Sequence, residues 1–89
     1  MTLKIERSSG NHGTRIWLHG ELRAEHLDEL CAEIGRGQPR VTLDLDEVDL
    51  VDIDAVRFLN GCEAQAVELV NCSRYIQEWM SQERGREKI

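Results

Sequence analysis

An acidic run in the middle of the chain is the part of the sequence whose residue types could do chemistry. The stretch DLDEVDLVDID, residues 44–54, holds six carboxylates in eleven positions. On either side acidic and basic residues balance, six of each in residues 1–43 and five of each in residues 55–89. The net charge of −6 therefore comes from this run, which could hold a metal ion, transfer a phosphoryl group or stand in for a phosphorylated side chain.

The spacing of these carboxylates does not fit a calcium loop. An EF-hand loop needs oxygen ligands at its first, third and fifth positions and Gly at its sixth. Starting from Asp44 the fifth position is Val48, and starting from Asp46 it is Leu50, so the template fails. We expect no metal site and no cofactor.

Phosphoryl transfer has a local match only. The segment VTLDLDEV, residues 41–48, resembles the strand-end motif of haloacid-dehalogenase-like phosphatases, with Asp44 as the nucleophile and Asp46 as the acid/base. Those enzymes also need a Lys that balances the phosphoryl charge and a second acidic pair for magnesium. After residue 55 the only Lys is Lys88, and no acidic pair follows. A phosphoryl-transfer fragment that uses Asp44 and Asp46 therefore remains the alternative hypothesis. Our main expectation is that the chain has no catalytic residue and is not an enzyme.

The elements that position the acidic run follow from the hydrophobic pattern. Apolar residues alternate with polar ones in strands, and they recur at i, i+3, i+4 and i+7 on one face of a helix. A Ser, Thr, Asp or Asn often stands just before a helix begins. The pattern predicts strands at 3–7, 14–19, 40–45 and 66–70, and helices at 24–35, from about residue 54, and after Ser73.

The order β-β-α-β-α-β-α gives an α/β fold class. The two strand–helix–strand crossovers should be parallel, and the first strand an antiparallel edge. Because the strands alternate, we expect a four-stranded mixed sheet with helices mainly on one face. Trp17, Asp44 and Glu68 should lie towards the open face. Asp46 to Asp52 should form the loop after the third strand, and Asp54 should open the second helix.

Composition limits the class of protein further. Eighty-nine residues make one small domain, expected at 1–82, with a polar tail at 83–89 that frays. Few aromatic residues and no basic stripe argue against nucleic-acid binding. No apolar run approaches roughly 18 residues, and the first residues lack a signal-peptide core, so we expect a cytoplasmic protein without membrane insertion. Cys31, Cys62 and Cys72 form no CxxC pair and are expected as buried reduced thiols.

Three further segments, taken in order, resemble a STAS domain, the fold of the anti-sigma factor antagonists. WLHGEL (17–22) ends the expected hairpin like the family's apolar-x-Gly-x-Leu. VTLDLDEVDLVDIDAVRFL (41–59) resembles the family's strand, its apolar-Asp-Ser-Ser/Thr-Gly sequence and the helix after it. VELVNCS (67–73) resembles the last strand and its turn. The resemblance covers the chain from Leu3 to about Met80.

The resemblance implies a non-catalytic bacterial regulator of transcription that binds an anti-sigma factor or a related kinase-type regulator. Asp54 falls where the family carries the Ser or Thr that the partner kinase phosphorylates, so the chain should not be switched there. A phosphoserine carries about −1.5 to −2 charge, and Asp54 supplies roughly half of that. Asp54 is either a permanent, partial imitation of phosphate or an ordinary helix-start acid. For Asp52 we expect a helix cap.

The predicted contact surface combines the acidic run with the start of the second helix. Its residues are Asp46, Asp49, Asp52, Ile53, Asp54, Ala55 and Arg57. STAS domains also occur in transporters and stress-signalling complexes, so a place in such an assembly remains a second interpretation. Trp17, an aromatic residue on the expected open face, is a candidate contact for a partner or for a second copy in a homodimer.

Overall fold

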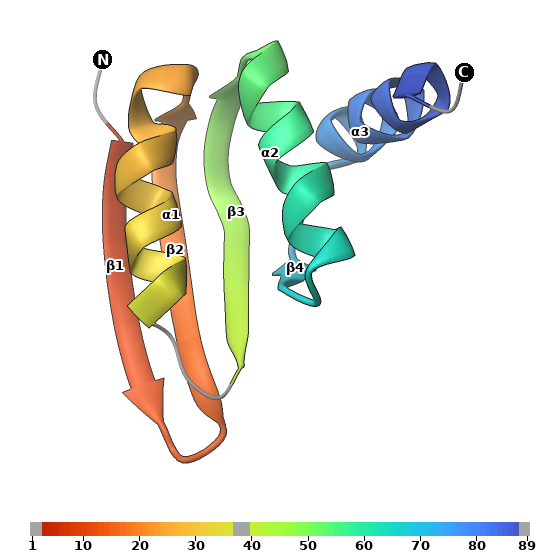
Figure 1. Cartoon of the computed structure of the whole chain (residues 1–89). Coiled ribbons are helices and arrows are strands. Elements are labelled where there is room, and N and C mark those ends of the chain that lie inside the picture. The colour runs from red at the N-terminus through yellow and green to blue at the C-terminus, as the bar shows by residue number, and fades with distance from the viewer. Residues whose placement is uncertain (1–2, 37–39, 88–89) are drawn as a thin grey trace.

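The chain folds as an α/β domain with a four-stranded mixed sheet, as the order of predicted elements indicated (Figure 1). The structure, a computed structural model, describes residues 3–36 and 40–87. The elements are β1 (Leu3–Gly10), β2 (Gly13–Leu22), α1 (Leu27–Arg36), β3 (Val41–Val51), α2 (Ile53–Ala64), β4 (Glu68–Val70) and α3 (Arg74–Glu87). A short 3-10 turn, Ala24–His26, leads into α1.

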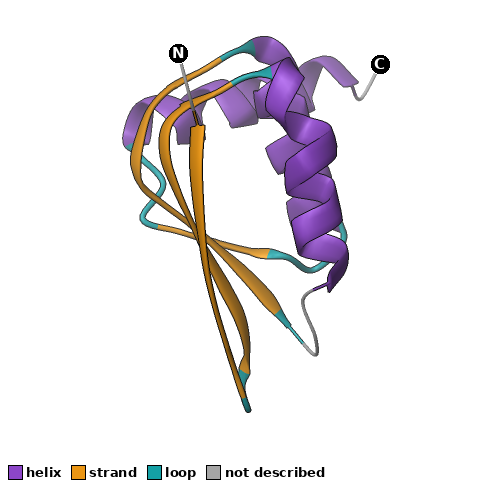
Figure 2. Ribbon diagram, turned by 90° about the vertical axis from the view of Figure 1, so that its left-hand side faces the viewer, coloured by secondary structure: helices purple, strands orange, loops and turns teal. Residues whose placement is uncertain are grey.

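The sheet has the order β1-β2-β3-β4. β1 is antiparallel to β2, and the β2–β3 and β3–β4 pairs are parallel, which confirms the expected antiparallel edge. α1 and α2 lie side by side on one face of the sheet, and α3 lies beyond α2, on the side away from α1 (Figures 1 and 2). None of the helices in the described ranges is long and apolar enough to cross a membrane.

The core lies between the sheet and its helices. Alternate residues of β2 and β3 point into it because successive side chains of a strand face opposite sides. They meet apolar side chains from all three helices. The largest fully buried side chains are those of Ile16, Leu18, Leu22, Leu30, Leu43, Leu45, Val56, Leu59 and Ile76.

β3 is longer than predicted, and this corrects the expected place of the acidic run. The strand continues from residue 45 to Val51, so Asp46 to Val51 are strand residues and not a loop. Its pairing with β2 shifts twice, and at each shift β3 holds one extra residue, as in a β-bulge. The buried positions of its second half are therefore Leu45, Val48 and Val51, three residues apart, and the residues between them face outwards.

The last helix also differs from the prediction. Ser73 precedes it, and the Ser73 hydroxyl accepts a hydrogen bond from Ile76 N at 3.3 Å, consistent with the expected cap. α3 then continues to Glu87, so residues 83–87, which were expected to fray, are helical. Glu83 is buried there and lies 3.2 Å from the Arg57 guanidinium of α2. Residues 88–89 of the expected tail lie outside the described residues.

The cysteines follow the prediction in part. Cys62 is buried and Cys72 is half-buried, but Cys31 is exposed on the solvent side of α1, which contradicts the prediction for that residue. Burial, with smaller contributions from Cys31 and Glu63, raises the pKa of the Cys62 thiol to about 11. Cys62 therefore stays protonated, and its thiol is a weak nucleophile at neutral pH.

Ala66, just after the end of α2, has a backbone conformation that Ala does not favour. Val67 N donates to Cys62 O at 2.9 Å and Ala66 N to Glu63 O at 3.2 Å, the two hydrogen bonds of a Schellman motif. In that motif the residue after the helix is left-handed and is usually Gly. Here it is Ala66, with φ 66°.

Replacing this residue should stabilise the fold. Ala66→Gly removes a left-handed Ala, and we expect the free energy of unfolding to rise by about 1 kcal/mol. Ala64→Gly, two residues earlier and still helical, is the matched control and should lower it by up to about 1 kcal/mol. Urea unfolding followed by circular dichroism measures both. Equal effects of the two changes would contradict this account of Ala66.

Candidate functional site

Asp52 links the ends of two strands to the starts of two helical segments. Its Oδ1 accepts a hydrogen bond from Ala55 N at 2.9 Å, which caps α2. Its Oδ2 accepts one from Ala24 N at 2.9 Å, in the first residue of the turn before α1. Its own N–H donates to Leu22 O, the last residue of β2, at 3.3 Å. The predicted cap is confirmed, and both carboxylate oxygens already have partners inside the protein.

The first turn of α2 presents one apolar and one acidic side chain to solvent. Ile53 is 37% exposed, and Asp54 is exposed beside it. The Asp54 side chain makes no hydrogen bond or ion pair with any other residue in the described ranges. Ala55 is fully buried in the core, so its side chain offers no surface to a partner. Of the three central residues of the predicted site, two are therefore accessible.

The remaining predicted contacts lie on either side of this turn. Asp46 and Asp49 are exposed on the bulged half of β3. Arg57 lies one turn into α2, and its Nε donates to Glu83 Oε1 at 3.2 Å. Arg57 therefore belongs in part to the α2–α3 interface, although about half of its side chain remains exposed.

The prediction missed Leu50, an exposed apolar residue three positions before Ile53 in the chain. Leu50 is 40% exposed, because the second register shift of β3 turns it outwards. Leu50 and Ile53 are two of three exposed large hydrophobic residues in the described ranges; the third is Tyr75 on α3. The spacing of Leu45, Val48 and Val51 could have revealed Leu50, since one face cannot bury both Val51 and its neighbour.

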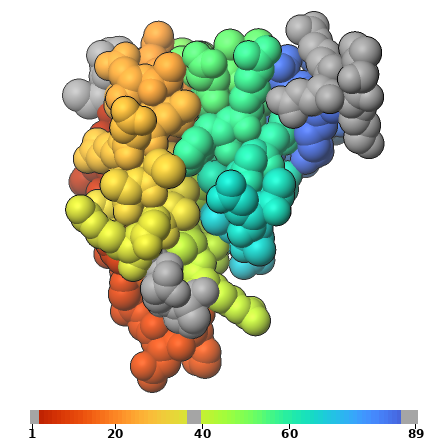
Figure 3. Space-filling view, in the orientation of Figure 1, coloured from red at the N-terminus to blue at the C-terminus, as the bar shows by residue number. Residues whose placement is uncertain are grey.

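Unpaired acids concentrate around this surface. Seven carboxylates make no ion pair or side-chain hydrogen bond with another described residue, and they lie on the second half of β3 and at the starts of α1 and α2. They are Glu25, Asp28, Glu29, Asp46, Glu47, Asp49 and Asp54. In Figure 3 the starts of α1 and α2 occupy the same end of the molecule. This end therefore combines four acids of the acidic run with three acids from the start of α1 and the turn before it.

Asp44 sits on the other face of the sheet and is fully engaged. Trp17 pairs with Asp44 across β2 and β3, away from the core residues, as predicted for the open face. Arg15 Nη2 donates to Asp44 Oδ2 at 2.7 Å, and its guanidinium lies 5.6 Å from the Trp17 ring. Asn71 Nδ2 lies 3.1 Å from both Asp44 oxygens, and Asp46 N donates to Oδ1 at 3.0 Å.

These contacts decide the charge of Asp44. Burial alone would raise its pKa, but the hydrogen bonds from Arg15, Asp46 N and Asn71, together with the Arg15 charge, outweigh it and lower the pKa below 3.8. Asp44 is therefore an ionised carboxylate held by three donors. Glu68, also predicted for the open face, pairs in register with Thr42 on that face.

This geometry gives no support to Asp44 as a phosphoryl acceptor. A nucleophilic carboxylate needs an oxygen free to approach the substrate, and both oxygens of Asp44 are occupied. The Asp46 side chain is exposed. It is the backbone N–H of Asp46, and not its carboxylate, that bonds to the Asp44 carboxylate. Within the residues the structure describes, no group of three or more His, Cys, Asp or Glu side chains could hold a metal ion.

Comparison with known proteins adds no family: no family model and no curated protein matches the chain. Fold and site together define a small α/β domain with an exposed apolar and acidic surface where β3 passes into α2. What that surface does follows from its geometry and from the resemblance of the sequence segments.

Removing the double cap should be costly. Asp52→Ala leaves the N–H groups of Ala55 and Ala24 without their acceptor, and we expect a loss of about 2–3 kcal/mol in the free energy of unfolding. Asp54→Ala, two residues away and exposed, is the control and should change it by less than about 0.5 kcal/mol. Chemical unfolding compares the two. Similar values would show that the cap is not what holds the helix starts.

The Asp44 network should make stability fall in acid. Because its pKa is lower in the folded state, Asp44 contributes stability above pH 3.8, and this contribution is lost as the pH falls through the folded-state value. Asp44→Asn should lower the free energy of unfolding by about 2 kcal/mol at pH 7. The difference between wild type and variant should shrink below pH 3.8. Unfolding curves at several pH values test this, and a constant difference would contradict it.

Proposed function

We propose that this chain is a STAS-like regulatory domain that acts by binding a protein and not by catalysis, with the end of β3 and the start of α2 as its contact surface. The observation that carries the proposal is the first turn of α2, where Ile53 and Asp54 are exposed while Asp52 fixes the backbone beneath them. The element order and the parallel β2–β3–β4 arrangement support the STAS-like topology.

The composition of the surface favours a protein partner. Interfaces combine apolar anchors near their centre with a polar rim. Leu50 and Ile53 can serve as the anchors, and the exposed Asp46 and Asp49 lie near them in the chain as rim charges. Because these acids lack cationic partners within the described residues, a partner that brings Lys or Arg would neutralise them without breaking an existing ion pair.

By the resemblance, the partner is an anti-sigma factor or a related kinase-type regulator in the bacterial cytoplasm. In the STAS family the unphosphorylated Ser or Thr form binds this partner, and phosphorylation breaks the complex. Asp54 stands at that position with a permanent charge, at a helix start that favours negative charge by about 0.3–1 kcal/mol. In this proposal Asp54 imitates the phosphorylated state in part and keeps the affinity low.

Restoring a hydroxyl tests the proposal. Asp54→Ser should capture the kinase-type regulator from native lysate at least about tenfold better than wild type, because about 1.4 kcal/mol of lost repulsion is a factor of ten. Added ATP should release it by phosphorylation of the new Ser. Asp28→Ser removes an equivalent exposed charge from the start of α1 and should behave like wild type.

Two outcomes contradict parts of the proposal. If wild type and Asp54→Ser capture the same regulator equally and ATP changes nothing, Asp54 does not imitate phosphate and the domain is an unswitched binding module. If neither captures such a regulator, while the circular dichroism of both is unchanged, the partner assignment is wrong.

A further inference from the structure

β1 is a long free edge of the sheet. It pairs with β2 along all eight of its residues, and in the described part of the chain no strand lies on its other side (Figure 1). The opposite edge strand, β4, has only three residues. A long free edge presents backbone N–H and C=O groups that can accept a further strand, and natural proteins usually shorten or cover such edges.

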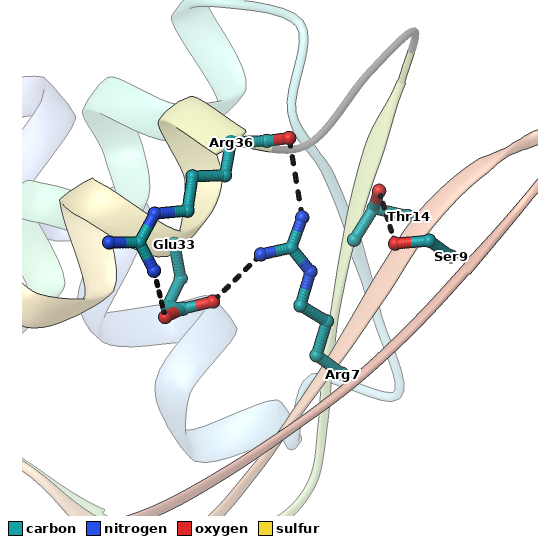
Figure 4. A network of polar contacts seen from close by, with 5 residues as sticks. All are labelled: Arg7, Ser9, Thr14, Glu33 and Arg36. Carbon is teal, nitrogen blue, oxygen red and sulfur yellow. Dashed lines mark hydrogen bonds and ion pairs between the residues drawn. The ribbon is translucent and has the colours of Figure 1, made fainter.

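The helix-side residues of β1 leave apolar surface uncovered. Leu3 and Ile5 pack against the margin of the core but remain half-buried. Arg7, the next residue on that side, crosses to α1, where its guanidinium lies 3.0 Å from Glu33 Oε1 and 3.2 Å from Arg36 O (Figure 4). A strand placed beside β1 would cover Leu3 and Ile5 without disturbing this contact.

The open-face residues of β1 carry one charge of each sign. Lys4 and Glu6 pair in register with His19 and Trp17 on that face, and their side chains are 71% and 52% exposed. They lie 3.9 Å apart, the longest of the ion pairs in the described residues. Glu6 Oε1 also lies 2.8 Å from His19 Nε2, but without hydrogen-bond alignment. Both charges can therefore turn towards a neighbouring strand at small cost.

We propose that β1 pairs antiparallel with β1 of a second copy, about a two-fold axis at Ile5. If the axis is perpendicular to the sheet, both copies keep their helices on the same face, and each residue meets one that points to the same side. Centred on Ile5, the pairing places Lys4 opposite Glu6 of the second copy, twice, and Ile5 opposite itself.

The neighbouring registers are disfavoured by like charges. Centred on Lys4, Glu6 or Arg7, the pairing sets that residue opposite its own copy, and like charges directly opposite each other are destabilising. The register at Ile5 avoids this and sets the apolar side chain of Ile5 opposite its own copy, with Leu3 opposite Arg7. The result is a continuous eight-stranded sheet in which β1 is no longer an edge.

Self-association should be weak because the described paired segment is short. Five residues from each copy, Leu3 to Arg7, give an interface below about 1,200 Å², the range of transient complexes. We expect a dimer with a dissociation constant in the range of about 10 μM to 1 mM, seen by sedimentation equilibrium as a concentration-dependent mass.

A charge-exchange experiment tests the register. Lys4→Glu places Glu opposite Glu6 twice, and Glu6→Lys places Lys opposite Lys4 twice. Each variant alone should self-associate at least about tenfold more weakly than wild type. An equimolar mixture of the two variants restores both opposite-charge pairs and should form the mixed dimer with about wild-type affinity. Glu29→Lys, an exposed charge reversal on α1, is the control and should not weaken the dimer.

This experiment distinguishes an effect of the strand register on dimer affinity from an effect of the overall net charge. Glu6→Lys lowers the overall negative charge, so general repulsion between copies would predict a stronger dimer, whereas the Ile5 register predicts a weaker one. A wild-type chain that stays monomeric at about 1 mM overturns the proposal and leaves the edge to another protein's strand. A mixture that associates no better than the single variants also overturns it. None of these measurements depends on the function proposed for α2.

Discussion

One carboxylate positions both helices that cover the sheet. The first N–H groups of a helix lack partners within it, and an anionic acceptor near them is favoured by the helix dipole as well as by hydrogen bonding. Asp52 meets this need for α2 and for the turn that leads into α1, while its own backbone is tied to the end of β2. The starts of α1 and α2 are therefore held side by side, and the exposed surface around Ile53 and Asp54 takes its position from this contact.

The sequence was sufficient to predict features that depend on neighbouring residues. It was not sufficient where the structure depends on how distant strands pair. The caps at Asp52 and Ser73 and the element order follow from periodicity and residue type, and the structure confirms them, whereas Cys31 of the expected α1 stripe is exposed. The second half of β3 was misjudged because two extra residues break the alternation that identifies a strand. Its acidic residues fit a loop by composition, yet a β3 strand with bulges exposes them equally well.

The candidate site likewise contains residues that could be placed from the sequence and contacts that could not. Asp52 and Asp54 could be placed from the sequence because a helix start can be recognised within a few residues. The partners of Asp44 could not, since Arg15 lies 29 residues before it and Asn71 lies 27 residues after it. Asn71 reaches Asp44 from a left-handed turn with φ 57°, a conformation that Asn tolerates better than most residues. The register of β2 and β3 brings Arg15 and Asp44 together as an ion pair, and both oxygens of Asp44 are engaged inside the fold.

The two proposed contact surfaces lie on different parts of the fold, and this has a consequence for binding. β1 forms one edge of the sheet, whereas α2 lies on the other side of α1 (Figure 1). Pairing through β1 therefore leaves the start of α2 free, and a two-fold dimer would present two such surfaces with their helices on the same face. Two linked sites bind a dimeric partner far more tightly than one, provided that the geometry allows both contacts at once. If Asp54 lowers the affinity of each site as proposed, the pair of sites would recover that affinity, and the domain would then discriminate between partners by their oligomeric state and not by phosphorylation.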